Sequence, residues 1–251
     1  MRSIAERRAA FRALHQSGCF VLPNPWDGGS AIRLAKLGFQ ALASTSAGAA
    51  WALGKADGQM SLEEVLEHLS LLVARTDLPV NADFEAGFAD SPDGVAGNVA
   101  RCIETGVAGL SIEDRLGQGL YRLDQVVQRV RAAREAIDRS GEDVVLVGRC
   151  EAFWLGQPDF DQVVERLTAY SRAGADCLYA PGIKDLQTIA RLVRALDKPV
   201  NANLSGTGLS VAALAAVGVR RVSVGGALAR ATWTAFEGIA ERLWTEGRLP
   251  A

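Results

Sequence analysis

The sequence predicts one domain over residues 1–251, a (β/α)8 barrel of the TIM type with parallel strands. Short β-rich runs alternate with longer helical patterns eight times, which is typical of a parallel sheet. The chain length suits one such barrel, which these units favour over an open doubly wound sheet. The phrase "PVNA" also occurs twice, opening at Pro79 and at Pro199, about half the chain apart. This spacing places the two copies on opposite walls of an eight-stranded barrel.

The expected strands are short runs rich in apolar and β-branched residues. They cover residues 19–24, 40–45, 79–84, 109–114, 144–149, 177–182, 199–203 and 220–226. The amphipathic helices expected between them include residues 61–74, 122–139, 159–173, 185–196 and 210–217. Ser61, with Glu64 three residues later, predicts a capping box at the first of these helices. Residues 1–18 carry charges at every turn and are expected to form a capping helix.

Composition excludes several classes of protein. A formal net charge of −2 with scattered arginines gives no basis for binding nucleic acid or an anionic membrane. No stretch approaches the roughly 18 consecutive apolar residues of a membrane span, and the N-terminus does not resemble a secretory signal. The four cysteines lie far apart and are expected to be small buried residues in a reducing compartment. We therefore expect a cytoplasmic protein with a small-molecule partner.

Acidic residues end two neighbouring strands. Asp83 and Glu85 follow the third strand and Glu113 ends the fourth, and the active site of such a barrel lies at these strand ends. Carboxylates brought together repel each other unless a cation lies between them. Oxygen ligands favour Mg²⁺, with Mn²⁺ as the alternative, and zinc is disfavoured because His15 and His68 fall on helices. The sequence therefore predicts a divalent metal site.

An anion site is expected beside the metal. The segment "STSAG" at residues 44–48 follows the second strand as a loop whose backbone N–H groups can hold a carboxylate or an oxyanion. Arg149 ends the fifth strand and offers a planar fork to a carboxylate. A metal that chelates a carboxylate and an adjacent carbonyl then indicates a 2-oxo acid. Two further acids, Asp114 and Glu151, are expected at the surface or as helix N-caps.

Four segments, in order along the chain, resemble one family. "LPVNADFEAGFA", "GVAGLSIEDR", "LVGRCEAF" and "PVNANLSGTG" are similar to motifs of the isocitrate lyase and phosphoenolpyruvate mutase superfamily. The resemblance implies Asp83 as the direct Mg²⁺ ligand and places Glu85, Glu113 and Asp57 in the same metal shell. It further implies a substrate site made by Thr45, Ser46, Ala47, Gly48, Arg149, Tyr179, Asn203 and Ser205. Arg149, Glu113 and Tyr179 are the expected catalytic residues.

The loop after the fourth strand departs from this family. Its lyases carry a "KKCGH" or "KRCGH" segment with an acid-base Cys, and its mutases and related hydrolases carry "PKxNS". Residues 115–121 read "RLGQGLY" and contain no Cys, Lys, His or Asn. Glu85 replaces an Asp of the family's metal shell, and Pro181 stands where the methylisocitrate-type lyases have a Glu. The groups that could move a proton are then Tyr121, Tyr179 or a metal-bound water.

These observations predict a Mg²⁺-dependent lyase-type enzyme that binds a 2-oxo acid and cleaves a carbon–carbon bond, or decarboxylates, through a metal-stabilised enolate. Three alternatives stay open. One is a hydrolase of a 2-oxo dicarboxylate, and another is a protein of the same fold that binds a 2-oxo acid without turnover. The third is a phosphate-binding barrel isomerase or aldolase that grips phosphate at Gly225 and Gly226.

The C-terminal segment, residues 231–251, predicts a helix with one apolar face. Its large apolar residues are Trp233, Phe236, Ile239, Leu243 and Trp244. In the resembled family this helix is exchanged between subunits, which implies a homodimer or homotetramer. A helix packed on its own barrel is the alternative.

Overall fold

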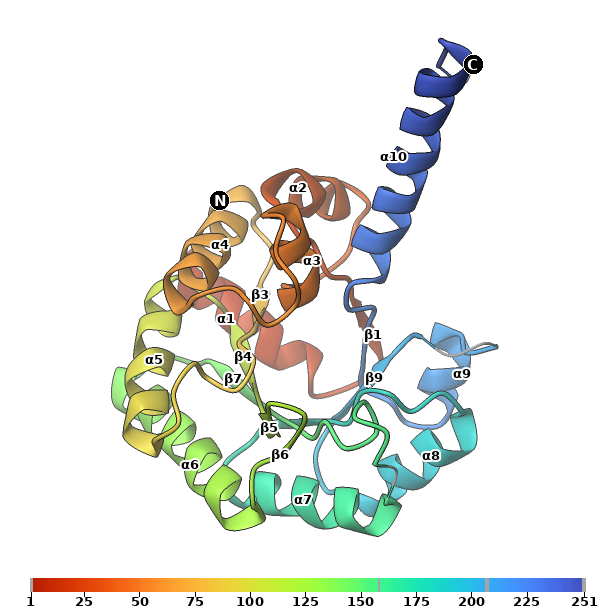
Figure 1. Ribbon diagram of the computed structural model, residues 1–251. Helices are drawn as coiled ribbons and strands as arrows, with labels where there is room; N and C mark the ends of the chain where they lie inside the picture. The colour runs from red at the N-terminus through yellow and green to blue at the C-terminus, as the bar shows by residue number, and fades with distance from the viewer. Residues whose placement is uncertain (1, 158, 206–207, 250–251) are drawn as a thin grey trace.

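Eight parallel strands form a barrel, as the sequence predicts (Figure 1). The computed structural model describes residues 2–157, 159–205 and 208–249, so the predicted segments that include residues 206–207 and 250–251 lie partly outside the described residues. The barrel strands are β1 (Phe20–Leu22), β2 (Leu42–Ala43), β3 (Val80–Asp83), β4 (Gly109–Glu113), β7 (Val145–Arg149), β8 (Cys177–Tyr179), β9 (Val200–Asn203) and β10 (Arg221–Ser223). Their order is β1-β10-β9-β8-β7-β4-β3-β2. The backbone N–H of Ala43 donates to the carbonyl of Pro23 at 3.1 Å and joins the two ends.

Among the described residues, ten helices accompany the strands, and most of them surround the barrel (Figure 1). They are α1 (Ile4–Leu14), α2 (Gly28–Lys36), α3 (Ser46–Ala52), α4 (Leu62–Arg75), α5 (Pro92–Glu104), α6 (Leu123–Ser140), α7 (Phe160–Arg172), α8 (Leu186–Ala195), α9 (Val211–Ala216) and α10 (Ala227–Glu246). The predicted capping box of α4 is present, because Ser61 N–H donates to Glu64 at 2.7 Å and Glu64 N–H donates to Ser61 at 3.3 Å.

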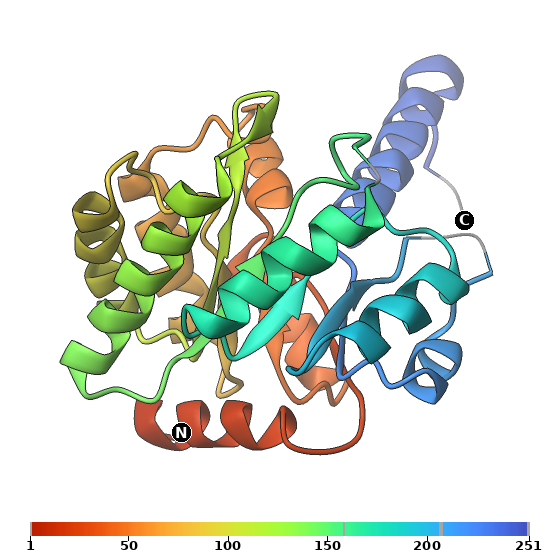
Figure 2. The same ribbon diagram turned by 90° about the horizontal axis from the view of Figure 1, so that it is seen from below.

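The core has two parts. One lies between the barrel and the surrounding helices, and the other fills the lower barrel with Phe20, Leu22, Val145, Val147 and Cys177. Helix α1 crosses the N-terminal end of the barrel (Figure 2), and its Phe11 closes that end. The cysteines are free, and three of the four are fully buried, as expected of small apolar residues. The barrel is thus closed at the N-terminal ends of its strands, which leaves the C-terminal ends for a cavity.

Two elements differ from the sequence-based expectation. Residues 115–120 form a hairpin of β5 (Arg115–Leu116) and β6 (Gly119–Leu120), where a short bare loop is predicted. Residues 46–52 form a helix, where a loop is predicted. Helix α10 projects away from the barrel (Figure 1), and Ala229 is its only buried described residue. Among the described residues, none of the helices is both long enough and apolar enough to cross a membrane.

Candidate active site

A cavity of about 550 Å³ opens at the C-terminal ends of the strands. All but one of the predicted site residues line it, and they reach it from six different strands or their following loops. These are Thr45, Ser46, Ala47, Asp57, Asp83, Glu85, Glu113, Arg149, Tyr179, Asn203 and Ser205. The remaining one, Gly48, does not line the cavity. A Cβ there would lie 2.7 Å from Thr45 Cγ2 and 2.9 Å from Trp26 Cβ, so Gly48 permits close packing instead.

Arg149 lies among three carboxylates at the upper level of the barrel. Its Nη1 is 3.0 Å from Asp83 Oδ1 and 3.4 Å from Glu113 Oε2. Its Nε donates to Glu151 Oε1 at 2.6 Å. These carboxylates raise the pKa of Arg149 although burial acts to lower it. The guanidinium therefore stays charged and holds the acids together.

Glu85 is the acid that Arg149 does not pair with. It has a backbone φ of 45°, a conformation rare for residues other than glycine, in the loop between β3 and α5. Its Oε1 is buried without a hydrogen-bond partner among the described residues. Burial, and then the charges of Asp83 and Asp57, raise the pKa of Glu85 to about 7. A buried polar atom without a partner is costly, so this oxygen is suited to a cation.

Glu113 has a similar environment. Burial raises the pKa of Glu113 to about 8 against the opposing charge of Arg149, and the neighbouring Glu151 and Asp83 add to the rise. As the side chains lie here, the described residues contain no group of three or more His, Cys, Asp or Glu arranged to hold a metal ion. The chemistry of the set nevertheless fits a hard divalent cation, since all the donors are oxygens and one of them has no partner.

The segment after β2 supports Asp83. Ser46 donates to Asp83 Oδ2 from its backbone N–H at 3.0 Å and from its hydroxyl at 2.9 Å. Thr45 caps α3, because its hydroxyl accepts from Gly48 N–H at 3.3 Å. The prediction of a loop with free N–H groups is therefore wrong for Ser46 and Gly48. The Thr-Ser-Ala-Gly run instead starts a helix whose first N–H groups serve Asp83 and the cap.

The expectation for Asp114 and Glu151 is also wrong. Both are buried, with 0% and 1% of their surface exposed. Asp114 accepts hydrogen bonds from Arg166 Nε at 2.8 Å, the Tyr170 hydroxyl at 2.6 Å and the Glu151 N–H at 2.8 Å. It therefore fixes the backbone of Glu151, which in turn holds Arg149. A surface acid and a buried anchor after a strand look alike in the sequence.

Comparison with known proteins identifies the family. The sequence profile of the phosphoenolpyruvate phosphomutase family matches residues 11–244. The chain belongs to the phosphoenolpyruvate mutase and isocitrate lyase superfamily. An oxaloacetate decarboxylase of Chromohalobacter salexigens is 35% identical over 232 residues, which cover 86% of this chain and 77% of that protein. The named relatives of the superfamily include lyases and decarboxylases, and this chain is a lyase-type enzyme.

Solved structures of the superfamily share the whole fold. A crystal structure from Burkholderia cenocepacia J2315, provisionally described as a lyase or mutase, has a TM-score of 0.95 and 46% identity and covers 98% of this chain and 91% of that one. Oxaloacetate acetylhydrolase in complex with its product oxalate has a TM-score of 0.92 and 26% identity, with 100% and 91% covered.

The proton-moving residues offered by the sequence separate in space. Tyr179 lines the cavity, accepts a hydrogen bond from Asn203 Nδ2 at 3.2 Å, and lies below the Arg149 guanidinium. Burial raises the pKa of Tyr179, so the phenol keeps its proton. Tyr121 does not line the cavity, and its hydroxyl donates to Asp90 at 3.1 Å. Tyr121 is therefore removed from the candidates, and none of the described residues lining the cavity is His, Cys or Lys.

Sequence reasoning missed several lining residues. From the hairpin, Arg115 and Gln118 reach the cavity, so the segment after β4 brings polar groups to it. Asn24 fixes the loop after β10, because its Oδ1 accepts from the N–H groups of Val224 and Gly225, both at 2.9 Å. The N–H of Gly225 is therefore already bonded, which weakens the alternative of a phosphate grip at this glycine pair.

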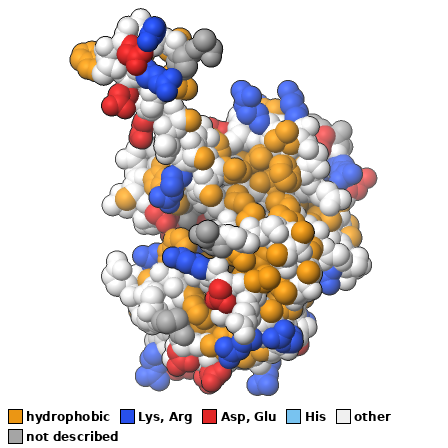
Figure 3. Space-filling model, turned by 90° about the vertical axis from the view of Figure 1, so that its right-hand side faces the viewer, with side chains coloured by type: hydrophobic (Ala, Val, Ile, Leu, Met, Phe, Trp, Pro, Cys, Tyr) orange, Lys and Arg blue, Asp and Glu red, His pale blue; other side chains and the backbone are white. Residues whose placement is uncertain are grey.

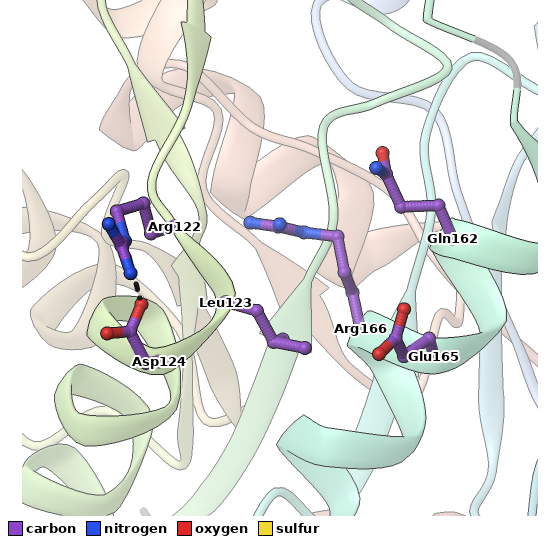
Figure 4. Close-up of a pocket in the computed structure, with 6 residues that line it drawn as sticks. All are labelled: Arg122, Leu123, Asp124, Gln162, Glu165 and Arg166. Carbon is purple, nitrogen blue, oxygen red and sulfur yellow. Dashed lines mark hydrogen bonds and ion pairs between the residues drawn. The ribbon is translucent and has the colours of Figure 1, made fainter.

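A second hollow, of about 710 Å³, lies on the outer surface between α6 and α7 (Figure 4). Arg122 and Asp124 pair across one side of it at 3.2 Å. Arg166 extends from α7 toward the interior, where Asp114 already binds it. The predicted acids, Arg149 and Tyr179 line the cavity at the strand ends and not this hollow, so we place the chemistry in that cavity.

Proposed function

We propose that this lyase-type enzyme uses a divalent metal, Mg²⁺ or Mn²⁺, to act on a 2-oxo acid. One observation carries the proposal. Asp83, Glu85 and Glu113 line one cavity, and burial raises the pKa of both glutamates. Glu85 Oε1 also lacks a hydrogen-bond partner among the described residues. Such a set costs free energy without a cation, and a hard cation would offset that cost. Asp83 would be the direct ligand, and Glu85, Glu113 and Asp57 would complete the shell.

The chain's own residues then perform binding and proton transfer. A bound divalent cation supplies Lewis-acid stabilisation of negative charge on the carbonyl oxygen of a 2-oxo acid. Arg149 stays charged and can pair with a substrate carboxylate, Asn203 offers an amide donor from β9, and Ser46 on the opposite wall holds Asp83 in place. Thr45, Ala47 and Ser205 complete the substrate contacts in this proposal.

The reaction is the cleavage of the bond between carbons 3 and 4, one carbon removed from the 2-oxo group. Its electron pair passes into the enolate of the remaining 2-oxo acid, and the other fragment leaves as carbon dioxide or as a carbonyl compound. Tyr179 keeps its proton at neutral pH and faces the cavity, so we assign it the transfer of one proton to the enolate carbon. Decarboxylation needs no further base, and the relative from Chromohalobacter salexigens is an oxaloacetate decarboxylase.

The test is a screen of 2-oxo acids and their aldol adducts with Mg²⁺ and with EDTA. We expect turnover with Mg²⁺ that EDTA and Asp83→Ala each abolish. Glu67→Gln serves as the matched control, because Glu67 is exposed on α4 away from the cavity, and it should retain full activity. Turnover that survives both EDTA and Asp83→Ala would overturn the metal proposal.

A second candidate is a protein of the same fold that binds 2-oxo acids without turnover. The lack of His, Cys and Lys among the described cavity residues favours it. Calorimetry that shows Mg²⁺-dependent binding of a 2-oxo dicarboxylate, with no product by NMR after long incubation, would establish this candidate. Release of oxalate and a second acid from such a substrate would instead indicate a hydrolase, as in the oxaloacetate acetylhydrolase of the superfamily.

We further propose that α10 is exchanged between subunits of a homodimer or homotetramer. Every described residue from Ala231 onward on this helix is exposed, including Phe236 at 60% and Trp244 at 89%. Figure 3 faces the side from which α10 departs, and apolar side chains gather there. Helices in proteins gain most of their stability from packing an apolar face, so the exposed apolar residues of α10 support a partner subunit that covers them.

A further inference from the structure

The lower part of the cavity contains a buried cation with no anionic partner. Arg221, the first residue of β10, has 3% of its surface exposed and lines the cavity. Its Nε donates to Asn201 Oδ1 at 2.9 Å, and its Nη1 lies 3.3 Å from Asn81 Oδ1 and 3.4 Å from His15 Nε2. No ion pair of Arg221 exists among the described residues.

None of these partners is an anion, so the positive charge of Arg221 is not neutralised by them. Burial lowers the pKa of Arg221, and no carboxylate acts to raise it. A buried guanidinium surrounded only by neutral groups is unfavourable, and an anion beside it would relieve that cost. The lining at this level is also neutral, since it consists of Asn81, Ser111, Asn201 and Ser223.

The two copies of "PVNA" produce this arrangement. Asn81 on β3 and Asn201 on β9 occupy the same place in each copy, and their amide oxygens meet at Arg221. Asn201 is oriented by its own Nδ2, which donates to Ser223 at 3.0 Å. An acid at either position would have neutralised Arg221, and the acids among the described residues that line the cavity lie higher, at Asp83 and its neighbours.

We propose that Arg221 is a second anion-recognition group, which binds the distal carboxylate of a dicarboxylate substrate at the floor of the barrel. The inference rests on the proposed function, because the metal level would hold the other end of the same substrate. Asn81 and Asp83 both face the cavity and are two residues apart on one strand, so the two levels are separated by roughly 6.6 Å. A four- or five-carbon dicarboxylate can reach both.

Pairing with Arg221 affects the reactivity of the bound carboxylate. A carboxylate paired with Arg221 is stabilised as an anion, which opposes its loss as carbon dioxide. The carboxylate on Arg221 is therefore one that the product retains, so of the two proposed reactions this pairing favours cleavage that releases a carbonyl compound over loss of the distal carboxylate as carbon dioxide. Favoured substrates have a carboxylate that reaches Arg221 and a cleavable bond between the level of Arg221 and the metal level.

The test uses two acids that share one end. Lactate and malate have the same 2-hydroxy acid group for the metal level, and malate adds the distal carboxylate. With Mg²⁺-loaded protein, calorimetry should show at least tenfold tighter binding of malate, measured for both enantiomers of each acid. Arg221→Met should remove this preference and leave lactate within twofold, whereas Arg221→Lys should keep part of it.

Asn201→Asp provides an independent variant that preserves the volume of the site. The new carboxylate pairs with Arg221 and occupies it, so the preference for malate should fall at least tenfold while thermal unfolding stays near that of the wild type. An unchanged malate preference in both Arg221→Met and Asn201→Asp would overturn the inference.

Crystals soaked in bromide with EDTA separate this inference from the proposed function. Anomalous scattering should place bromide beside the Arg221 guanidinium without any metal. Bromide at Arg221 with no binding of either acid would mean that the proposed function fails and the anion site stands. If both acids bind without a preference for malate, and no bromide is found at Arg221, the proposed function stands and the anion site at Arg221 fails.

Discussion

The substitution Asp114→Asn tests how the buried network beneath the site supports it. The carboxylate accepts three hydrogen bonds at 2.6 to 2.8 Å and has no exposed surface. In the variant, an amide NH2 group replaces one carboxylate oxygen and faces the donors of Arg166 and Tyr170. The buried guanidinium of Arg166 also loses its anionic partner. Breaking a buried pair in this way costs about 3 to 5 kcal/mol in the free energy of unfolding.

Urea unfolding monitored by circular dichroism measures this cost. Tyr170→Phe is the matched control, since it removes the hydroxyl that donates to Asp114 and accepts from Arg166 but leaves the Asp114–Arg166 ion pair intact, and it should cost only about 1.5 to 3 kcal/mol. The double variant Asp114→Asn/Arg166→Met should lose less than the sum of the two single changes, because it no longer buries an unpaired charge. A loss below about 1 kcal/mol for Asp114→Asn would refute this account of the network.

Three further predictions concern packing, pH and assembly. Gly48→Ala should lower the free energy of unfolding by about 1 to 3 kcal/mol, since its Cβ would lie within 3 Å of Thr45 and Trp26, and an unchanged urea midpoint would contradict this. Burial, and then the charge of Arg221, lower the pKa of His15 to about 4, below the ordinary value near 6.5. Between these two pH values His15 takes up a proton only in the unfolded chain, so the free energy of unfolding should fall by up to about 3 kcal/mol as pH drops from 6.5 to 4. The fall should be smaller in His15→Gln, and equal pH profiles of the two proteins would contradict this prediction. Phe236→Glu should convert the oligomer to smaller species in light scattering, and a wild-type protein that is already monomeric would contradict the exchanged helix.

The barrel was predictable because its signals are local and repeated. Each strand is a short apolar run bounded by turn residues, and the eight positions agree with the structure. The hairpin at residues 115–120 was missed because each of its strands has only two residues, too few for an alternation to appear. Helix α3 was missed because its Ser, Gly and Ala residues also suit a loop, and only the Thr45 cap decides between them.

The site was predictable as far as strand ends could be placed. Asp83, Glu113, Arg149 and Tyr179 converge because parallel strands present their last residues at one end of the barrel. Deeper residues were not predictable in the same way. An Asn inside an apolar strand looks like a minor interruption, and the meeting of Asn81 with Asn201 at Arg221 depends on register between strands that are far apart in sequence.

A crystal structure with Mn²⁺ and oxalate tests the central claim most directly, because anomalous scattering locates the metal without reference to activity. The account predicts one Mn²⁺ next to Asp83, with Glu85 and Glu113 facing it and oxalate between the metal and the residues that follow β2. It also predicts that the Mn²⁺ signal disappears in Asp83→Asn and persists in Glu67→Gln. A cavity that contains no Mn²⁺ at saturating concentration, or Mn²⁺ bound only away from these carboxylates, would contradict the account.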